Sequence, residues 1–306
     1  MSSPVIYRIR HKTRYRYASS AVSCHNLLHL TPRDTPSQRL LDHAIEMSPK
    51  ASSRYQFVDY YGNPCELREI HEAHTTLDIT LDCRVAVDPQ PTPTPASTVD
   101  WALVQLRPGA PSHLPMDVRE FTFASDFTPY DAEILAYAQE SFPDGCPILQ
   151  GALDLTRRIF TDFKYDPSAT TISTPVHEVF AKRSGVCQDF AHLQLACLRA
   201  LGVPARYVSG YLQTHAAPGT ERLQGADATH AWIAVFVPSY GWVDLDPTNN
   251  LLPSFEHITT AWGRDYRDVA PVSGVFTGPD AHDVSVEVDV EPEPAHAPAA
   301  ESTVQV

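Results

Sequence analysis

Three residues of this chain, Cys187, His230 and Asp246, have the types and the order that a nucleophilic catalytic site requires. A cysteine that attacks a carbonyl carbon needs a base, and the base needs a third group that fixes its orientation. His230 and Asp246 follow Cys187 in the chain and can fill these two roles. The chemistry that such a set supports is acyl transfer from an amide or peptide bond.

Cys187 is predicted to lie at the start of a helix. Apolar residues recur at intervals of three and four over residues 190–201, which is typical of an amphipathic helix, and a glycine and a proline follow. Residues 184–185 should form a flexible entry, so the thiol falls in the first turn. There the unpaired backbone N–H groups and the helix dipole favour a thiolate. Cys197, in the middle of the helix, is expected to be a core residue.

His230 and Asp246 are predicted to lie on the two strands of a hairpin. Residues 229–237 alternate in polarity, and residues 241–246 follow after a loop of three residues. With that loop, the even-numbered residues of both strands share one face of the sheet. His230 is then one diagonal step, roughly 7 Å, from Asp246 and about twice that from Asp244. The geometry therefore favours Asp246, although a loop of four residues would reverse the face of one strand.

Each of the three residues also has an ordinary structural interpretation. Cys187 could be a small buried residue, His230 a partly buried strand residue, and Asp246 the turn residue before a proline. A zinc site built from the same side chains is a further alternative, and it requires zinc to co-purify. The complete set favours catalysis because it fills all three roles in this chain order.

Composition narrows the possible partners and location. The chain of 306 residues has 23 basic and 37 acidic residues, a net charge of −14, which disfavours nucleic acid because phosphate binding requires a basic surface. No stretch approaches the ~20 apolar residues that cross a bilayer, and the start does not resemble a leader. We therefore expect a cytoplasmic protein with no membrane partner. Six scattered cysteines without zinc-finger spacing predict reduced thiols and no metal or other cofactor.

Patterning along the chain predicts two domains of an α+β protein. Residues 1–88 contain short alternating runs separated by turn signals, which are typical of an antiparallel β-sandwich. A proline-rich linker is assigned to residues 89–112, and helical patterns followed by strands define a catalytic core over residues 113–291. The acidic residues 292–306 are predicted to be a disordered tail.

Single elements can also be predicted within these domains. Helices are expected over residues 128–139, beginning with a Thr-Pro cap, and over residues 148–163, and the alternation in residues 284–290 predicts one last half-buried strand. The histidines of the first domain have no recurrent spacing and are expected to be ordinary strand and loop residues: His11, His25, His29, His43, His71 and His74.

Four segments resemble the transglutaminase-like superfamily of papain-like thiol enzymes, especially its bacterial members with a β-rich N-terminal region. The segments are residues 184–192, 202–211, 229–232 and 241–248. Residues 257–271 also resemble a tail segment of the bacterial group, and residues 5–87 resemble its N-terminal region. The resemblance thus spans nearly the whole chain.

This resemblance implies a papain-like, transglutaminase-like core preceded by an antiparallel β-sandwich. It implies Cys187 as nucleophile, His230 as base and Asp246 as acid in a thiol protease or amidase that acts on a protein or peptide through an acyl-thioester. Transamidation of protein glutamine by the same triad, or a non-catalytic peptide-binding module, are the alternatives. Calcium activation is not implied, because no loop has EF-hand spacing. Tyr165 is a candidate second oxyanion donor, and the oligomeric state is not indicated.

Overall fold

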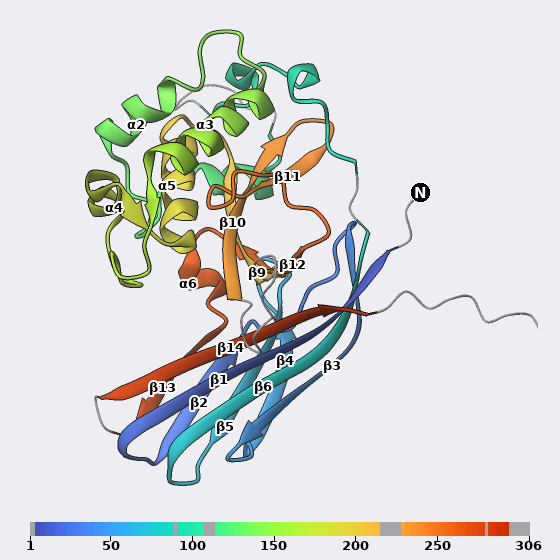
Figure 1. Ribbon diagram of the computed structural model, residues 1–306, viewed down its shortest axis with the longest axis vertical. Helices are drawn as coiled ribbons and strands as arrows, with labels where there is room; N and C mark the ends of the chain where they lie inside the picture. The colour runs from blue at the N-terminus through green and yellow to red at the C-terminus, as the bar shows by residue number, and fades with distance from the viewer. Residues whose placement is uncertain (1–3, 89–90, 107–113, 215–227, 279–280, 294–306) are drawn as a thin grey trace, which may run out of the picture.

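The computed structural model describes residues 4–88, 91–106, 114–214, 228–278 and 281–293. Strands dominate one half of the molecule, and helices covering a sheet form the other half (Figure 1). The expected α+β class, with a β-sandwich ahead of a mixed core, is confirmed.

The β-sandwich consists of two four-stranded antiparallel sheets with the orders β14-β1-β6-β3 and β13-β2-β5-β4. Its strands are β1 (Val5–Ala21), β2 (Ser23–Leu28), β3 (Gln38–Ser48), β4 (Ser53–Val58), β5 (Pro64–Ile70), β6 (His74–Val87), β13 (Val272–Thr277) and β14 (His282–Pro292). Strand β6 shows why the chain folds in this way, since its odd-numbered residues from Leu77 to Val85 are all buried between the sheets. That period of two is the alternation seen in the sequence.

The C-terminal strands complete the sandwich rather than the core. β14 pairs with β1 from Tyr7 to Tyr17, and β13 pairs with β2. The sequence pattern predicts that residues up to 291 belong to the core, so the observed domain arrangement differs from that expectation. The physical reason is that β1 and β2 each leave a sheet edge that needs a partner strand. The alternating pattern of residues 284–290 indicates that one face of this strand is buried, but it does not indicate which sheet the strand joins.

The core contains a third four-stranded antiparallel sheet, in the order β11-β10-β9-β12, with its main helices on one side (Figure 1). The longer elements are α2 (Ala132–Gln139), α3 (Ile148–Asp162), α4 (Val176–Lys182), α5 (Cys187–Ala200), β9 (Ala205–Leu212), β10 (Ala228–Val237), β11 (Gly241–Leu245) and β12 (His257–Gly263). The short ones are η1 (Pro95–Ser97), η2 (Trp101–Leu103), α1 (Met116–Arg119), η3 (Glu120–Thr122), β7 (Lys164–Tyr165), β8 (Ser184–Gly185) and α6 (Tyr266–Val269).

Both predicted helices before Cys187 are present, but one begins later than expected. Helix α2 begins at Ala132, with Asp131 as its N-cap accepting hydrogen bonds from the backbone N–H groups of Glu133 and Ile134. The expected Thr128 cap instead hydrogen-bonds Ser125 in the preceding turn. An aspartate three residues further on thus replaced the threonine, since both types cap well.

Helix α5 is the centre of the core. From Asp189 to Arg199 every one of its residues is buried, including the polar ones. The predicted helix is therefore confirmed, but it is enclosed on all sides instead of being amphipathic. Arg199 can be buried because its guanidinium donates to the backbone oxygens of Phe121 and Ala205 and to Thr128.

The predicted linker packs on the core along its described part. Val104 is fully buried, and the backbone N–H groups of Trp101 and Leu106 donate to Cys146 and Gly202. Through these contacts, the residues after the prolines pack against the core instead of forming a free linker. The predicted disordered tail lies outside the described residues beyond Glu293, and Pro292 still pairs with Tyr7.

Hydrogen bonds between side chains and backbone groups connect the sandwich to the core. The Tyr211 hydroxyl of β9 donates to the backbone oxygen of Leu30, and the Gln38 side chain bonds both the N–H and the C=O of Thr259. Asn63 in the β4–β5 turn likewise bonds both backbone groups of Trp262.

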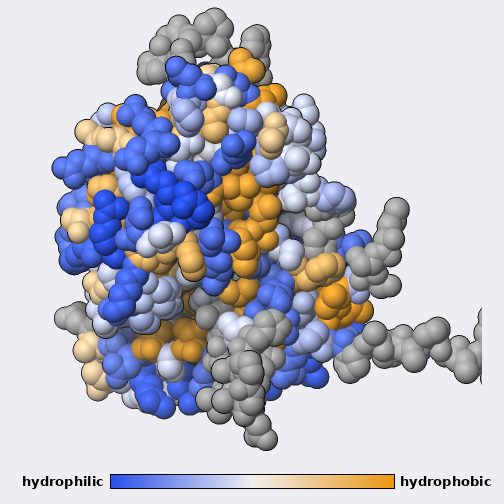
Figure 2. Space-filling model, turned by 45° about the horizontal axis from the view of Figure 1, so that its top comes forward, coloured by the Kyte–Doolittle hydropathy of each residue, from blue (hydrophilic) through white to orange (hydrophobic). Residues whose placement is uncertain are grey.

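The surface is mainly hydrophilic in the space-filling view, with hydrophobic residues gathered in a strip beside hydrophilic ones (Figure 2). In the described parts of the chain, no helix is both long and apolar enough to cross a membrane. A cytoplasmic location stays a prediction.

Candidate active site

Cys187 is the first residue of α5, as the sequence predicted. Val186 before it has an extended backbone and is the N-cap residue, and the thiol is only partly buried. The sulfur is therefore at the helix end that carries unpaired backbone N–H groups and the positive end of the helix dipole.

The entry to this helix is ordered. Strand β8 pairs in parallel with β7, joining Gly185 to Tyr165, so the flexible entry that was expected is wrong. The Asp189 carboxylate accepts hydrogen bonds from the Val186 N–H at 2.8 Å and from the Thr170 hydroxyl at 2.6 Å. A Cβ at Gly185 would lie 2.7 Å from an oxygen of that carboxylate. A side chain at residue 185 would therefore displace the Asp189 carboxylate from these hydrogen bonds.

His230 and Asp246 come from the predicted hairpin. Val237 pairs with Gly241 and Ile233 with Leu245, so the loop has three residues and the register is the expected one. The His230 Nε2 atom lies 2.8 Å from Asp246 Oδ2, and both side chains are buried. Of the two aspartates on this face, Asp246 is the one that contacts His230.

The Asp246 carboxylate is held by more partners than the sequence suggested. Its Oδ1 atom accepts from the backbone N–H groups of Thr248 and Asn249, and its Oδ2 atom accepts from the Asn249 side chain at 2.7 Å. A second histidine, His257 of β12, also places Nε2 3.1 Å from Oδ2. These contacts orient the carboxylate toward both imidazole rings.

His257 is the residue of this site that the sequence analysis missed. It is buried, and its ring lies 5.2 Å from the ring of Trp232 and 5.8 Å from that of His230. A signal was available, since His257 opens the tail segment noted for its resemblance to bacterial relatives. Sequence spacing could not connect it to Asp246, because β12 reaches the site from the far side of β9.

The pKa values show a strongly coupled set of charges. Burial opposes the charged form of His230, but hydrogen bonds with Asp246 and Cys187 outweigh it and raise the pKa of His230 to about 10. Burial likewise opposes ionisation of Asp246, yet hydrogen bonds from His230 and His257 hold its pKa well below the usual range. The arrangement thus favours an imidazolium between a carboxylate and a sulfur atom. A cation in that place stabilises a thiolate nucleophile.

Tyr165 lies near Cys187. It is half-exposed on β7, and its pKa is raised by desolvation and then by the charge of Cys187. The phenol is therefore close enough to the sulfur to sense its charge. An O–H donor in that position can contact an oxyanion formed on a substrate carbonyl.

Two groups of side chains have ligand atoms close enough for a metal ion. One is His230, Asp246 and His257, and the other is His29, Asp59 and Cys65, with ligand atoms in each group within 4.8 Å of one another. The first group shares its aspartate and one histidine with the arrangement around Cys187. Cys187 itself is not among these ligand sets of the described residues.

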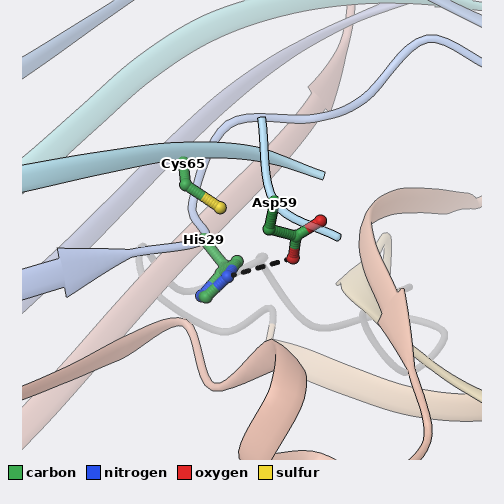
Figure 3. A group of neighbouring side chains, drawn as sticks. All are labelled: His29, Asp59 and Cys65. Atoms are coloured by element: carbon green, nitrogen blue, oxygen red, sulfur yellow. Dashed lines mark ion pairs between the residues drawn. The ribbon is translucent and has the colours of Figure 1, made fainter. Parts of the chain in front are cut away.

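The second group, here called the sandwich cluster, lies in the N-terminal domain (Figure 3). His29 Nε2 is 3.7 Å from Asp59 Oδ2, while its Nδ1 lies 3.2 Å from the backbone oxygen of Ala270. Asp59 Oδ1 accepts from the N–H groups of Tyr61 and Asn63 in the turn. The cluster is therefore accounted for as an ion pair within the N-terminal domain, next to a capped turn.

Comparisons with known proteins cover both halves of the chain. Residues 7–86 match the bacterial transglutaminase-like N-terminal region, and residues 137–247 match the transglutaminase-like superfamily. An uncharacterized protein of Mycobacterium tuberculosis is 41% identical over 292 residues, covering 94% of this chain and 92% of the relative. One from Mycobacterium leprae is 30% identical, covering 92% of this chain and 97% of the relative.

Two further comparisons concern named proteins. A protein-glutamine gamma-glutamyltransferase of Pseudomonas aeruginosa is 33% identical over 107 residues, which are 32% of this chain and 16% of that relative. The crystal structure of a candidate cysteine protease from Cytophaga hutchinsonii aligns with a TM-score of 0.73 at 22% identity, covering 95% of this chain and 91% of that one. This second match establishes that the two chains share one overall fold.

Proposed function

The chain belongs to the transglutaminase-like superfamily, whose members include cysteine-dependent enzymes of amide bonds, and we propose that it hydrolyses amide or peptide bonds through Cys187, His230 and Asp246. The observation that carries the proposal is the hydrogen bond between His230 and Asp246, together with a cysteine at the first turn of α5 whose sulfur contributes to the raised pKa of His230. The expected substrate is a protein or peptide.

The reaction begins with the Cys187 thiolate. The sulfur attacks the carbonyl carbon, and the oxyanion forms next to the backbone N–H groups of the first turn of α5, with the Tyr165 hydroxyl as a second donor. When the C–N bond breaks, the His230 imidazolium gives its proton to the leaving amine. The products of this half are the free amine and an acyl-thioester on Cys187.

The second half uses the same residues in reverse. Neutral His230 takes a proton from a water molecule, whose oxygen attacks the thioester carbonyl, and the C–S bond breaks to release a carboxylic acid and the thiolate. Asp246 keeps the imidazole oriented and stabilises its charged form throughout. His257 and Asn249 act as positioning residues, because they contact the Asp246 carboxylate.

Mass spectrometry of the trapped intermediate tests the proposal. Wild-type protein incubated with a peptide library and quenched in acid should carry an acyl adduct on Cys187, and the adduct mass identifies the acyl donor. The same peptides should then appear as hydrolysed acids. Turnover of an identified amide substrate by Cys187→Ala protein would contradict the mechanism.

Adding a primary amine separates hydrolysis from transamidation. With dansylcadaverine present, a hydrolase should still release mainly the free acid, whereas a transamidase would transfer the acyl group to the dansyl amine. Transfer as the main outcome would replace the hydrolytic proposal, and no adduct with any peptide would favour a binding module.

A further inference from the structure

A large cavity lies between the β-sandwich and the face of the core sheet that is turned away from α5. Its volume is about 920 Å³. The sandwich side contributes Gln38 and Tyr60, and the core sheet contributes Arg206, Trp242 and Trp262. Cys187 and His230 are not among its described lining residues, so the cavity is separate from the attacking sulfur. A volume of this size accommodates a short peptide rather than a single small ion.

Arg206 is the unusual residue of this cavity. Its side chain is buried, and Trp262 and Trp242 cover the guanidinium, with ring centroids 3.6 Å and 4.5 Å from its central carbon. Among the described residues it donates no side-chain hydrogen bond and forms no ion pair, and its Nε atom is buried without a partner. A buried guanidinium that lacks hydrogen bonds is costly, since each lost water contact has to be replaced.

The neighbouring charges indicate what kind of anion fits. Ala234 lies between Arg206 and Asp244 in one cross-strand row, so Asp244 attracts the guanidinium without forming an ion pair with it, while the charge of Arg33 acts in the opposite sense. Asp117 and Glu120 also line the cavity. A multiply charged phosphate would be repelled by these acids, whereas a single carboxylate can reach Arg206 and form the paired hydrogen bonds that guanidinium groups favour.

We propose that this cavity binds the C-terminal end of a peptide, with the terminal carboxylate on Arg206 and an aromatic or apolar side chain between Tyr60, Phe121 and the two tryptophans. The walls supply apolar contact area, and the row of Arg206 and Asp244 supplies one fixed cationic position. This is a second binding site that goes beyond the proposed hydrolysis.

The cavity also touches the catalytic group. His257 lines it and at the same time contacts Asp246 Oδ2 at 3.1 Å. A peptide bound there lies against the residue that positions the carboxylate of the proposed triad. A peptide bound in the cavity can therefore affect the position of the Asp246 carboxylate through the His257 side chain.

Calorimetric titration of Cys187→Ala protein tests the proposal without turnover. The probes are N-acetyl-Ala-Ala-Phe with a free carboxylate, the same peptide as its C-terminal amide, and N-acetyl-Ala-Glu-Phe amide, which has only a side-chain carboxylate. The free acid should bind about 10- to 100-fold more tightly than either amide, because only its carboxylate is placed to pair with Arg206. The preference should disappear in Arg206→Gln protein.

Control variants keep the outcome interpretable. Arg206→Lys retains the charge but not the paired donors, so it should keep part of the preference, while circular dichroism checks that both variants are folded. Arg157→Gln, which changes an exposed residue of α3, should bind the peptides like the Cys187→Ala parent. Equal binding of acid and amide, tighter binding of the glutamyl amide, an unchanged preference in Arg206→Gln, or no saturable heat with any probe would each overturn the proposal. Because Cys187 is absent throughout, none of these outcomes depends on the proposed hydrolysis.

Discussion

The core and the sandwich each contain a group of cysteine, histidine and aspartate, and the two groups are built differently. In the core group (Cys187, His230, Asp246) imidazole and carboxylate are 2.8 Å apart, and the sulfur is partly exposed at a helix start. In the sandwich cluster the corresponding distance is 3.7 Å, and Cys65 is buried within strand β5.

Their electrostatics differ as well. Burial raises the pKa of Cys65 to about 12, with a smaller contribution from nearby Asp59. In the core group the sulfur instead helps to raise the pKa of His230 to about 10, as partners of opposite charge do. The same three residue types therefore form two different environments. The proposed catalytic group differs from the sandwich cluster in its helix terminus, its accessible sulfur and its close imidazole.

The largest expected effect is the difference in kcat between a variant without the Cys187 sulfur and a variant without the Cys65 sulfur. Cys187→Ala should lower kcat by a factor on the order of 10⁴ or more, because no other group can form the thioester. Cys65→Ala should leave kcat within about twofold, since its sulfur is remote from the reaction. Hydrolysis of the peptide identified by adduct mass provides the measurement. A comparable loss in both variants would abolish the distinction between the groups.

Alkylation sharpens the same comparison without a substrate. At pH 7, iodoacetamide should modify Cys187 at least about 10³-fold faster than Cys65, whose thiol is buried and has a pKa of about 12. His230→Ala should slow the labelling of Cys187 and leave Cys65 unchanged. Peptide mapping over time gives both rates. Cys187 reacting no faster than the buried thiols would count against an activated nucleophile.

The pH dependence should follow His230. Its charged form is favoured up to a pKa of about 10, so kcat/KM should fall as the pH rises through that value and the leaving amine loses its proton donor. Asp246→Asn should move this alkaline fall in activity to lower pH and reduce kcat about 10²-fold, because the variant lacks the carboxylate whose hydrogen bond raises the pKa of His230. The associated stability is present below pH 6.5 and is lost as the pH rises through about 10. An alkaline limb that stays in place in Asp246→Asn would refute the assignment.

A smaller effect is expected at the second histidine. His257→Ala should lower kcat about 10-fold with little change in KM, since the Asp246 carboxylate loses one of its positioning contacts. His29→Ala, the matched change in the sandwich cluster, should not alter kcat. His257→Gln, which can still donate a hydrogen bond, should restore part of the loss. If His257→Gln behaved like His257→Ala, hydrogen-bonded positioning would not be its role.

The smallest effect is on stability alone. Asp59→Ala should lower the free energy of unfolding by about 1–3 kcal/mol, because the N–H groups of Tyr61 and Asn63 lose their acceptor. Asp42→Ala, at an exposed ion pair, should cost less than about 1 kcal/mol. Urea unfolding gives both values. At a temperature at which both variants are fully folded, their activity should equal that of the wild-type protein. Equal stability of the two variants would show that the turn contributes nothing.

Much of the core site could be predicted because its signals are local. The helix start at Cys187 and the three-residue loop of the β10–β11 hairpin follow from spacing within about ten residues, and both are present. His257 and the C-terminal strands could not be placed in this way. Their partners are Asp246 across the sheet and β1 at the other end of the chain, and such pairings leave only a pattern of alternation in the sequence.

Sequence by itself determined which residues carry reactive groups, which of them begin a helix or lie on a strand, and which face of the hairpin holds His230 and Asp246. Only the tertiary structure decided that His257 joins that carboxylate, that Cys65 is sealed inside the sandwich, and that Arg206 is buried without hydrogen bonds beside an interdomain cavity. The reason is that local periodicity reports which side of an element is buried, whereas the identity of the neighbour depends on contacts between segments far apart in the chain.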